Sequence, residues 1–169
     1  KARCETLRTL GPAMSPFNAF MLLQGLETLP VRMDRHCENA VGVAKFLQEH
    51  AAVSWVNYAG LKDNAYSAQV EKYLPMGAGS ILSFGVKGGI DAGAAFIESA
   101  EFLSHLANVG DAKTLIIHPA STTHRQLTEE QQIAAGVTPD MVRISVGLET
   151  LDDILWDLDQ ALNKSQNNQ

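Results

Sequence analysis

A short segment near the end of the chain is the best guide to the fold: residues 141–147 read MVRISVG. Successive side chains of a strand point to opposite faces, so Met141, Arg143 and Ser145 would share one face. The other face would carry only the branched apolar residues Val142 and Ile144, together with the valine that follows. The segment therefore predicts a strand with an arginine on one face and apolar side chains on the other.

Further strands and helices can be predicted on both sides of this segment. Residues 53–57 and 80–86 have β-type composition, and residues 106–109 and 114–117 predict two shorter strands. The clearest helix is residues 33–47, where apolar side chains recur every three or four positions. Additional helices are predicted at residues 64–73, 91–103, 128–136 and from residue 150 onward.

The order of these elements predicts an α+β fold. Strands and helices alternate without the spacing of repeated βαβ units, so we expect a small, mainly antiparallel sheet with helices packed on one face. A long helix should precede it, capped by Ser15 with Pro16 in its first turn and broken or kinked at Pro30. We expect a connecting arm and helix over residues 1–30, a main domain over residues 31–163 and a frayed tail over residues 164–169.

Composition excludes several classes of partner. The chain of 169 residues is 46% hydrophobic and carries a formal charge of −6, whereas a nucleic-acid partner requires clustered Lys and Arg. No apolar run approaches the roughly 20 residues that cross a membrane. Cys4 and Cys37 lack the spacing of a disulfide framework, which favours a reducing cytoplasm. The abrupt start at Lys1 is typical of an internal cut in a longer protein, and no signal peptide is expected.

Arg143 is the first candidate for a functional residue. A guanidinium in the middle of a strand is costly among apolar neighbours unless an anion meets its planar fork, and a carboxylate does so with two parallel hydrogen bonds. The alternative is a cross-strand ion pair with an Asp or Glu on a solvent-exposed face. Pattern alone favours the ion pair.

The second candidate is the pair of segments 107–111 and 116–124, which read ANVGD and IIHPASTTH. Short polar side chains in a loop after a strand often hold a ligand, although an ordinary polar loop has the same composition. The five histidines are too dispersed for a metal site, and Cys37 falls on the buried face of a predicted helix rather than in a nucleophile motif. We therefore expect no metal and no catalytic residue in this chain.

Several blocks together resemble the Cys/Met metabolism family of pyridoxal-phosphate (PLP) enzymes. Residues 15–20 (SPFNAF), 24–29 (QGLETL), 108–115 (NVGDAKTL), 118–124 (HPASTTH) and 142–149 (VRISVGLE) match in order and spacing, and the resemblance runs from about residue 11 to residue 162. Residues 73–75 (YLP) and 136–141 (GVTPDM) are similar to the O-acetylhomoserine sulfhydrylase branch. Asn108 departs from the lyase branches, which more often carry serine there.

The resemblance implies a site and a reaction. Arg143 would clamp the substrate α-carboxylate with help from Asn108, and Val109 and Thr123 would line the pocket. The Schiff-base lysine lies in a Ser-x-Thr-Lys type motif in this family; that motif does not occur here, so PLP would be attached to an N-terminal domain outside this chain.

The intact enzyme would be a cytoplasmic homotetramer that makes homocysteine from O-acetylhomoserine and sulfide or a thiol by γ-replacement, and this piece alone would be inactive. Methionine γ-lyase, cystathionine γ-synthase and a non-catalytic ligand-binding module remain the alternatives.

Overall fold

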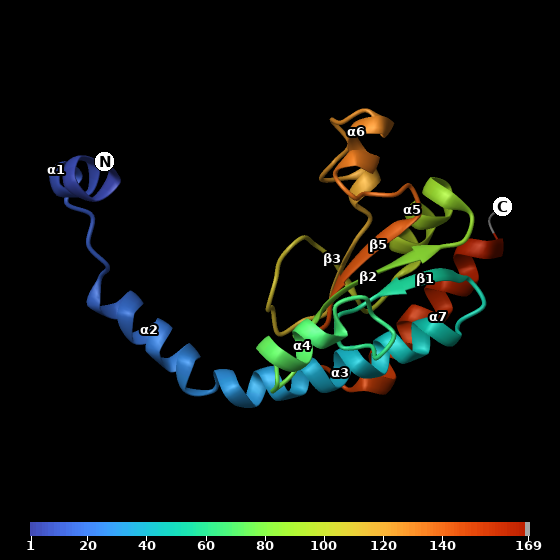
Figure 1. The fold of residues 1–169 in the computed structure, drawn as a ribbon, viewed down its shortest axis with the longest axis horizontal. Helices are drawn as coiled ribbons and strands as arrows, with labels where there is room; N and C mark the ends of the chain where they lie inside the picture. Colours follow the sequence, from blue (N-terminus) through green and yellow to red (C-terminus); the bar gives the residue numbers. More distant parts are fainter. Residues whose placement is uncertain (168–169) are drawn as a thin grey trace. The chain divides into compact units, whose positions relative to one another are not determined.

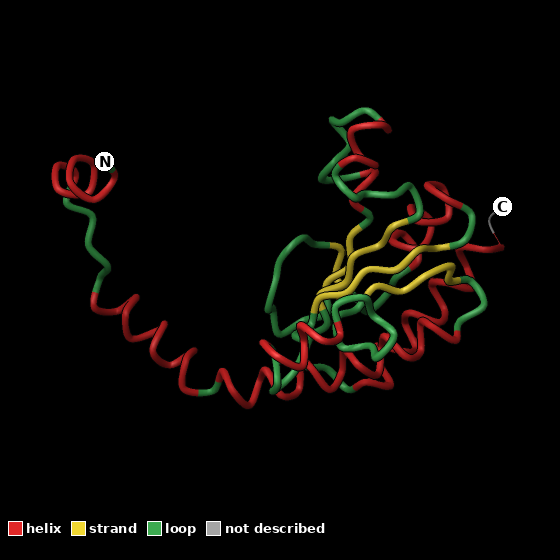
Figure 2. The backbone as a smooth tube through the Cα atoms, in the orientation of Figure 1, coloured by secondary structure: helices red, strands yellow, loops and turns green. Residues whose placement is uncertain are grey.

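The computed structural model describes residues 1–167, and the chain divides into two compact units. One unit is Lys1–Arg32 and the other begins at Met33, near the boundary at residue 30 expected from the sequence. Figures 1 and 2 show that the sheet and most of the helices belong to the second unit. Within residues 1–167, no helix is both long and apolar enough to cross a membrane.

The first unit is helical. It contains the π-helix Ala2–Leu7, the short α1 (Arg8–Leu10) and α2 (Pro16–Glu27). The predicted cap is confirmed, because the Ser15 Oγ accepts a hydrogen bond from the Asn18 amide at 3.2 Å and Pro16 lies in the first turn. All the large apolar side chains of α2 are exposed, and their expected packing against another domain stays a prediction.

The long kinked helix expected before the domain is two helices. α2 ends at Glu27, its C-cap Thr28 is not helical, and α3 (Leu29–Glu49) begins one residue before Pro30. A proline in the first turn of a helix needs no amide donor, so Pro30 helps α3 to begin instead of kinking a continuous helix. The helix is therefore broken at residue 28, two residues before the proline where a break or a kink was predicted.

The second unit is built on a five-stranded sheet, as predicted mainly antiparallel. Its strands in spatial order are β1 (Val53–Asn57), β2 (Ile81–Val86), β5 (Met141–Ser145), β4 (Leu115–Ile117) and β3 (Ser104–His105). Among these strands only β3 and β4 pair in parallel. β5 lies at the centre, so the segment around Arg143 has neighbours on both sides.

Helices cover one face of this sheet (Figure 1). The predicted alternation along β5 is confirmed, since Val142 and Ile144 are fully buried and Arg143 between them is not. The core under the sheet is apolar, with Phe84 of β2 meeting Phe96 of α5 (Gly89–Ser99) edge to face at 5.7 Å. The other fully buried core residues of the covering helices, α3, α5 and α7 (Leu151–Asn167), include Ala40, Val43, Ala44, Leu47, Ile154, Leu158, Ala161 and Leu162.

The strand predicted at residues 106–109 is wrong. β3 is the two-residue strand Ser104–His105, and the chain leaves the sheet after Leu106, whose amide donates to the Ile116 carbonyl at 3.3 Å. Local turns dominate beyond it: the Asn108 side chain accepts a hydrogen bond from the Val109 amide at 2.9 Å, and Gly110 has φ +74°. Residues 106–113 are therefore a loop with exposed side chains at Leu106 and Val109.

Two helix boundaries also differ from the prediction. α5 ends at Ser99, four residues early, because the Asp157 carboxylate accepts the amides of Glu101, Phe102 and Leu103 at 2.8–3.0 Å. Burial alone would raise the Asp157 pKa, but these amide donors hold the pKa below its usual value. α4 (Ser67–Tyr73) begins three residues later than expected. α6 (Glu129–Ala134) is as predicted, because Thr128 forms its capping box and Gly136, with φ +80°, follows the C-cap Ala135.

The chain does not fray at residue 164. α7 continues to Asn167, because Lys164 pairs with Glu101 at 2.7 Å and the buried Ser165 donates to the Leu162 carbonyl at 2.7 Å. The rest of the expected frayed tail, residues 168–169, lies outside the described residues.

Candidate functional site

Arg143 lies on the sheet face that the helices leave uncovered. Its cross-strand neighbours are Ser83 of β2 and Ile117 of β4, and neither carries a charge. Its Nη2 donates to the Asn108 backbone carbonyl at 3.0 Å. Among residues 1–167 no carboxylate pairs with Arg143, so the cross-strand ion pair that the sequence pattern favoured is wrong.

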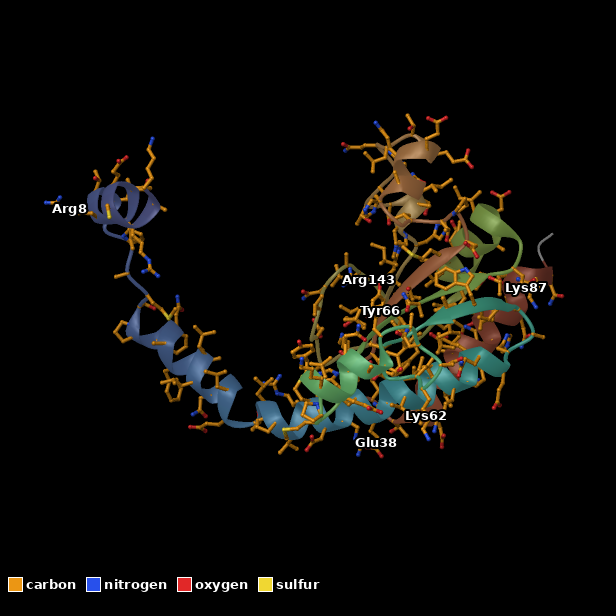
Figure 3. All side chains as sticks on the ribbon, in the orientation of Figure 1. Arg8, Glu38, Lys62, Tyr66, Lys87 and Arg143 are labelled. Atoms are coloured by element: carbon orange, nitrogen blue, oxygen red, sulfur yellow. The ribbon has the colours of Figure 1, made fainter. Side chains whose placement is uncertain are left out.

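A cleft of about 380 Å³ opens beside the Arg143 side chain. Ser83 and Met141 lie on the sheet beside it, and Tyr66 reaches it from the loop after β1; Figure 3 labels both Tyr66 and Arg143. A largely apolar wall with one cation is the lining expected for a small organic anion. The other lining residues are Asn57, Ala59, Asn64, Ile81 and Leu82.

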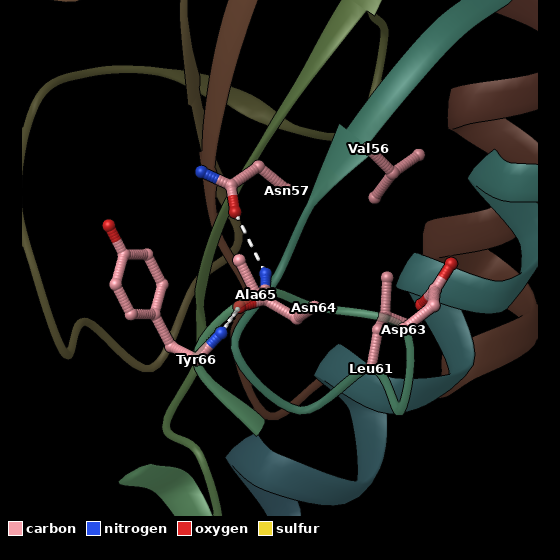
Figure 4. A pocket seen from close by; sticks show the side chains of 7 residues that line it. All are labelled: Val56, Asn57, Leu61, Asp63, Asn64, Ala65 and Tyr66. Carbon is pink, nitrogen blue, oxygen red and sulfur yellow. Dashed lines mark hydrogen bonds between the residues drawn. The ribbon is translucent and has the colours of Figure 1, made fainter. Parts of the chain in front are cut away.

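The loop that carries Tyr66 is fixed by its own amide side chains. Asn64 Nδ2 donates to the Asn57 Oδ1 at 3.0 Å, and Asn64 Oδ1 accepts the Tyr66 amide at 2.9 Å (Figure 4). These residues also line a second hollow of about 250 Å³ with Asp63. Sequence reasoning missed this loop, although the asparagine that ends β1 and the one that follows in the loop are a signal that could have found it.

The structure brings only one of the other predicted site residues to Arg143. Asn108 contributes its backbone carbonyl, while its side-chain oxygen is used within its own loop. Val109 is 64% exposed, and neither Val109 nor Thr123 lines the cleft. The Thr123 hydroxyl instead contacts the His124 Nδ1 at 2.9 Å.

The segment before Thr123 is anchored by a buried imidazole. His118 Nε2 lies 2.8 Å from the Pro139 carbonyl and Nδ1 lies 2.9 Å from the Ser121 hydroxyl. Burial lowers the His118 pKa, so the ring is neutral, with Nε2–H donating to the carbonyl and the hydroxyl donating to Nδ1. Both nitrogens are occupied, which gives His118 a structural role rather than an acid–base one.

No group of this site can attach PLP. Every lysine of the chain is exposed, and none lines the cleft beside Arg143. The described residues also contain no cluster that could hold a metal ion. The arrangement can therefore bind and orient an anionic substrate, and it does not fit the covalent attachment of the cofactor.

Comparisons with known proteins agree with a site that binds substrate in one part of a longer enzyme. O-acetyl-L-homoserine sulfhydrylase of Leptospira meyeri is 58% identical over 163 residues, which are 96% of this chain and 37% of the relative. The chain thus spans little more than a third of the length of the curated relatives it matches.

Two solved structures cover almost all of the chain. A protein of Campylobacter jejuni described as an O-acetylhomoserine (thiol)-lyase, which carries N'-pyridoxyl-lysine-5'-monophosphate, superposes with a TM-score of 0.87 at 44% identity, over 96% of this chain and 38% of that one. Cystathionine γ-synthase of Xanthomonas oryzae in complex with cystathionine gives a TM-score of 0.83 at 36% identity, over 95% and 41%. A family model described as Cys/Met metabolism PLP-dependent enzyme matches residues 1–163. The chain therefore belongs to the Cys/Met metabolism family of PLP-dependent enzymes.

Proposed function

We propose that this chain is the substrate-binding part of an O-acetylhomoserine sulfhydrylase, which makes homocysteine from O-acetylhomoserine and sulfide. The observation that carries the proposal is the Arg143 guanidinium, oriented by the Asn108 carbonyl and without a carboxylate partner among the described residues. A half-buried guanidinium with free donors is suited to a carboxylate ligand. The identity of 58% to a relative named for this activity supports the choice of reaction.

The residues of this chain would bind and orient the substrate. The α-carboxylate would accept two parallel hydrogen bonds from Arg143, and the apolar wall at Met141 and Tyr66 would exclude water from the carbon chain next to it. Fixing the carboxylate fixes the α-carbon, which lowers the entropic cost of reaching the reactive geometry. PLP, when bound, supplies the electron sink for the chemistry at that carbon.

The cofactor domain would be supplied by the rest of a longer protein. Two observations support this: no lysine lines the cleft, and the chain covers 37% of the relative's length. We infer that the complete enzyme is a cytoplasmic homotetramer and that the isolated chain is inactive. Val109 and Thr123 would line the site only after the loops of the complete enzyme assemble around the substrate.

Cystathionine γ-synthase is the second candidate, because a solved enzyme of that name shares the fold at 36% identity. The test uses the complete enzyme expressed from the gene that encodes this chain. O-acetylhomoserine is offered with sulfide or with cysteine, and homocysteine and cystathionine are quantified.

The proposal expects kcat/KM to be at least about tenfold higher with sulfide. A preference for cysteine supports the synthase instead. Release of ammonia and a 2-oxo acid without any acceptor indicates a γ-lyase.

A further inference from the structure

The loop that carries Asn108 is held at its far end by the carboxylate of Glu149. Glu149 Oε1 accepts the Thr114 amide at 2.6 Å, and Oε2 accepts the Thr114 hydroxyl at 2.8 Å. Thr114 is fully buried, so its donors have no access to water. A charged acceptor in such a place makes hydrogen bonds about twice as strong as neutral ones.

The same threonine ties the loop to the end of β5. The Thr114 hydroxyl accepts the Gly147 amide at 2.8 Å, and the Leu148 amide donates to the Ala112 carbonyl at 2.9 Å. A Cβ on Gly147 would lie 2.3 Å from the Glu149 Oε2 and 2.5 Å from the Ala112 carbonyl oxygen. Only glycine leaves room for the carboxylate to reach Thr114.

The loop is thus attached to one segment of the chain at both ends. Asn108 accepts from Arg143 at one end, and Thr114 donates to Glu149 at the other. Between these ends the Leu148 amide holds the Ala112 carbonyl, and Lys113 donates its amide to the Asp111 carboxylate at 3.0 Å. The Thr114 carbonyl also accepts the Ser104 amide at 3.1 Å, so removing the Glu149 carboxylate loosens this end of the loop without detaching it. The Asn108 carbonyl should then be held less firmly beside the guanidinium that it orients.

The backbone of Glu149 does not depend on its side chain. Asn39 Nδ2 donates to the carbonyls of Gly147 and Glu149 at 3.1 and 2.9 Å, and His36 Nδ1 lies 2.7 Å from the Val146 carbonyl. Both side chains come from α3 and are buried. The turn after β5 therefore keeps its place when the carboxylate is removed, so a change at Glu149 acts on the loop.

We propose that Glu149 is a positioning residue for the substrate-carboxylate site, acting through Thr114 and Asn108 on the orientation of Arg143. It lines neither the cleft nor its neighbouring hollow, so it does not touch the substrate itself. The proposal rests on the proposed function only in naming O-acetylhomoserine as the substrate. Any amino-acid substrate held through its α-carboxylate would show the same dependence.

The test compares Glu149→Ala, Glu149→Gln and Thr114→Val in the complete enzyme. The matched control is Glu101→Gln, which removes a carboxylate from an exposed ion pair with Lys164. Measured quantities are kcat, the KM of O-acetylhomoserine, the KM of sulfide, the PLP absorbance and the dissociation constant of the unreactive amino acid L-norvaline.

Glu149→Ala should raise the KM of O-acetylhomoserine and the dissociation constant of L-norvaline about tenfold, with kcat changed less than about threefold. Glu149→Gln keeps one acceptor and should raise the KM of O-acetylhomoserine and the dissociation constant of L-norvaline about threefold. Thr114→Val should give increases between those of the two Glu149 variants. The sulfide KM, the PLP absorbance and the control should stay at the wild-type values.

A Glu149 variant with lowered thermal stability but an unchanged KM and norvaline affinity would overturn the positioning role, because a purely structural contact has that signature. If Glu149→Ala yields no folded enzyme, Glu149→Gln and Thr114→Val decide in the same way. A wild-type enzyme that makes no homocysteine from O-acetylhomoserine refutes the proposed function alone. The norvaline measurement then still tests the role of Glu149.

Discussion

Replacing Arg143 with lysine tests the carboxylate site most directly. The guanidinium gives one donor to the Asn108 carbonyl at 3.0 Å and keeps a planar pair of donors for the substrate. An ammonium group keeps the charge but has no such pair, so it loses one of the two charge-assisted hydrogen bonds to the carboxylate.

The size of the effect follows from that single bond. A hydrogen bond to a charged group contributes about 1.5–3 kcal/mol, and about 1.36 kcal/mol corresponds to a factor of ten. Arg143→Lys should therefore lower kcat/KM of the complete enzyme about 10- to 150-fold. The KM of O-acetylhomoserine should rise most if the clamp acts in ground-state binding, and kcat should fall as well if it orients the α-carbon.

The assay is steady-state kinetics with O-acetylhomoserine and sulfide, with the PLP absorbance recorded for each variant. Arg35→Lys is the matched control, because Arg35 forms an exposed ion pair with Glu38 at 3.6 Å within its own helix. The PLP spectrum should persist in both variants. A folded Arg143→Lys enzyme with near wild-type kcat/KM would refute the assignment of Arg143 to the substrate.

Three further predictions concern the fold and the cofactor. Asp157→Asn should lower the free energy of unfolding at pH 7 by about 1–3 kcal/mol. The Asp157 pKa is depressed in the folded state, so the carboxylate stabilises the fold fully above the unfolded pKa of about 3.9. This stabilisation is lost as the pH falls through the folded pKa. The unfolding free energies of wild type and Asp157→Asn, measured by urea titration, should therefore converge below about pH 4. Gly93→Ala should lower the melting temperature without changing the KM of an active enzyme, because its Cβ would lie 2.5 Å from the His118 Nε2; unchanged melting would contradict this packing. Borohydride reduction of the isolated chain with PLP should label no lysine stoichiometrically, and peptide mapping that finds one specific site would contradict the proposed cofactor domain.

Local signals in the sequence predicted the elements that depend on neighbouring residues. The caps at Ser15 and Thr128 and the alternation along β5 are of this kind, because each involves side chains within a few positions of one another. The position of β3 was missed because it is set by pairing with β4, about ten residues away, and not by its own composition. The early end of α5 was missed for the same reason, since its cause is Asp157 on another helix.

The candidate site was predicted in part. Arg143 and Asn108 were named from the resemblance and do meet, but the use of the Asn108 backbone carbonyl depends on the path of its loop. Tyr66 and Asn57 reach the cleft because β1 pairs with β2 and β2 with β5, a series of long-range pairings that no local pattern encodes. The sequence pattern favoured a cross-strand ion pair for Arg143, and this prediction is wrong because no acidic residue lies opposite Arg143 on either neighbouring strand.

The parallel pairing of β3 with β4 limits how far the length of the 106–113 loop can vary. Two parallel neighbouring strands begin at the same end of the sheet, so the chain must cross back between them, and this connection normally requires a dozen or more residues. Here the chain returns within residues 106–114, which is feasible because β3 has only two residues. A deletion in this stretch would either unpair β3 or pull the Asn108 carbonyl away from Arg143. An insertion would lengthen the chain between Asn108 and Thr114 and hold the loop less firmly. Most surface loops tolerate changes in length, but in this one a change in the number of residues should move the Asn108 carbonyl relative to Arg143.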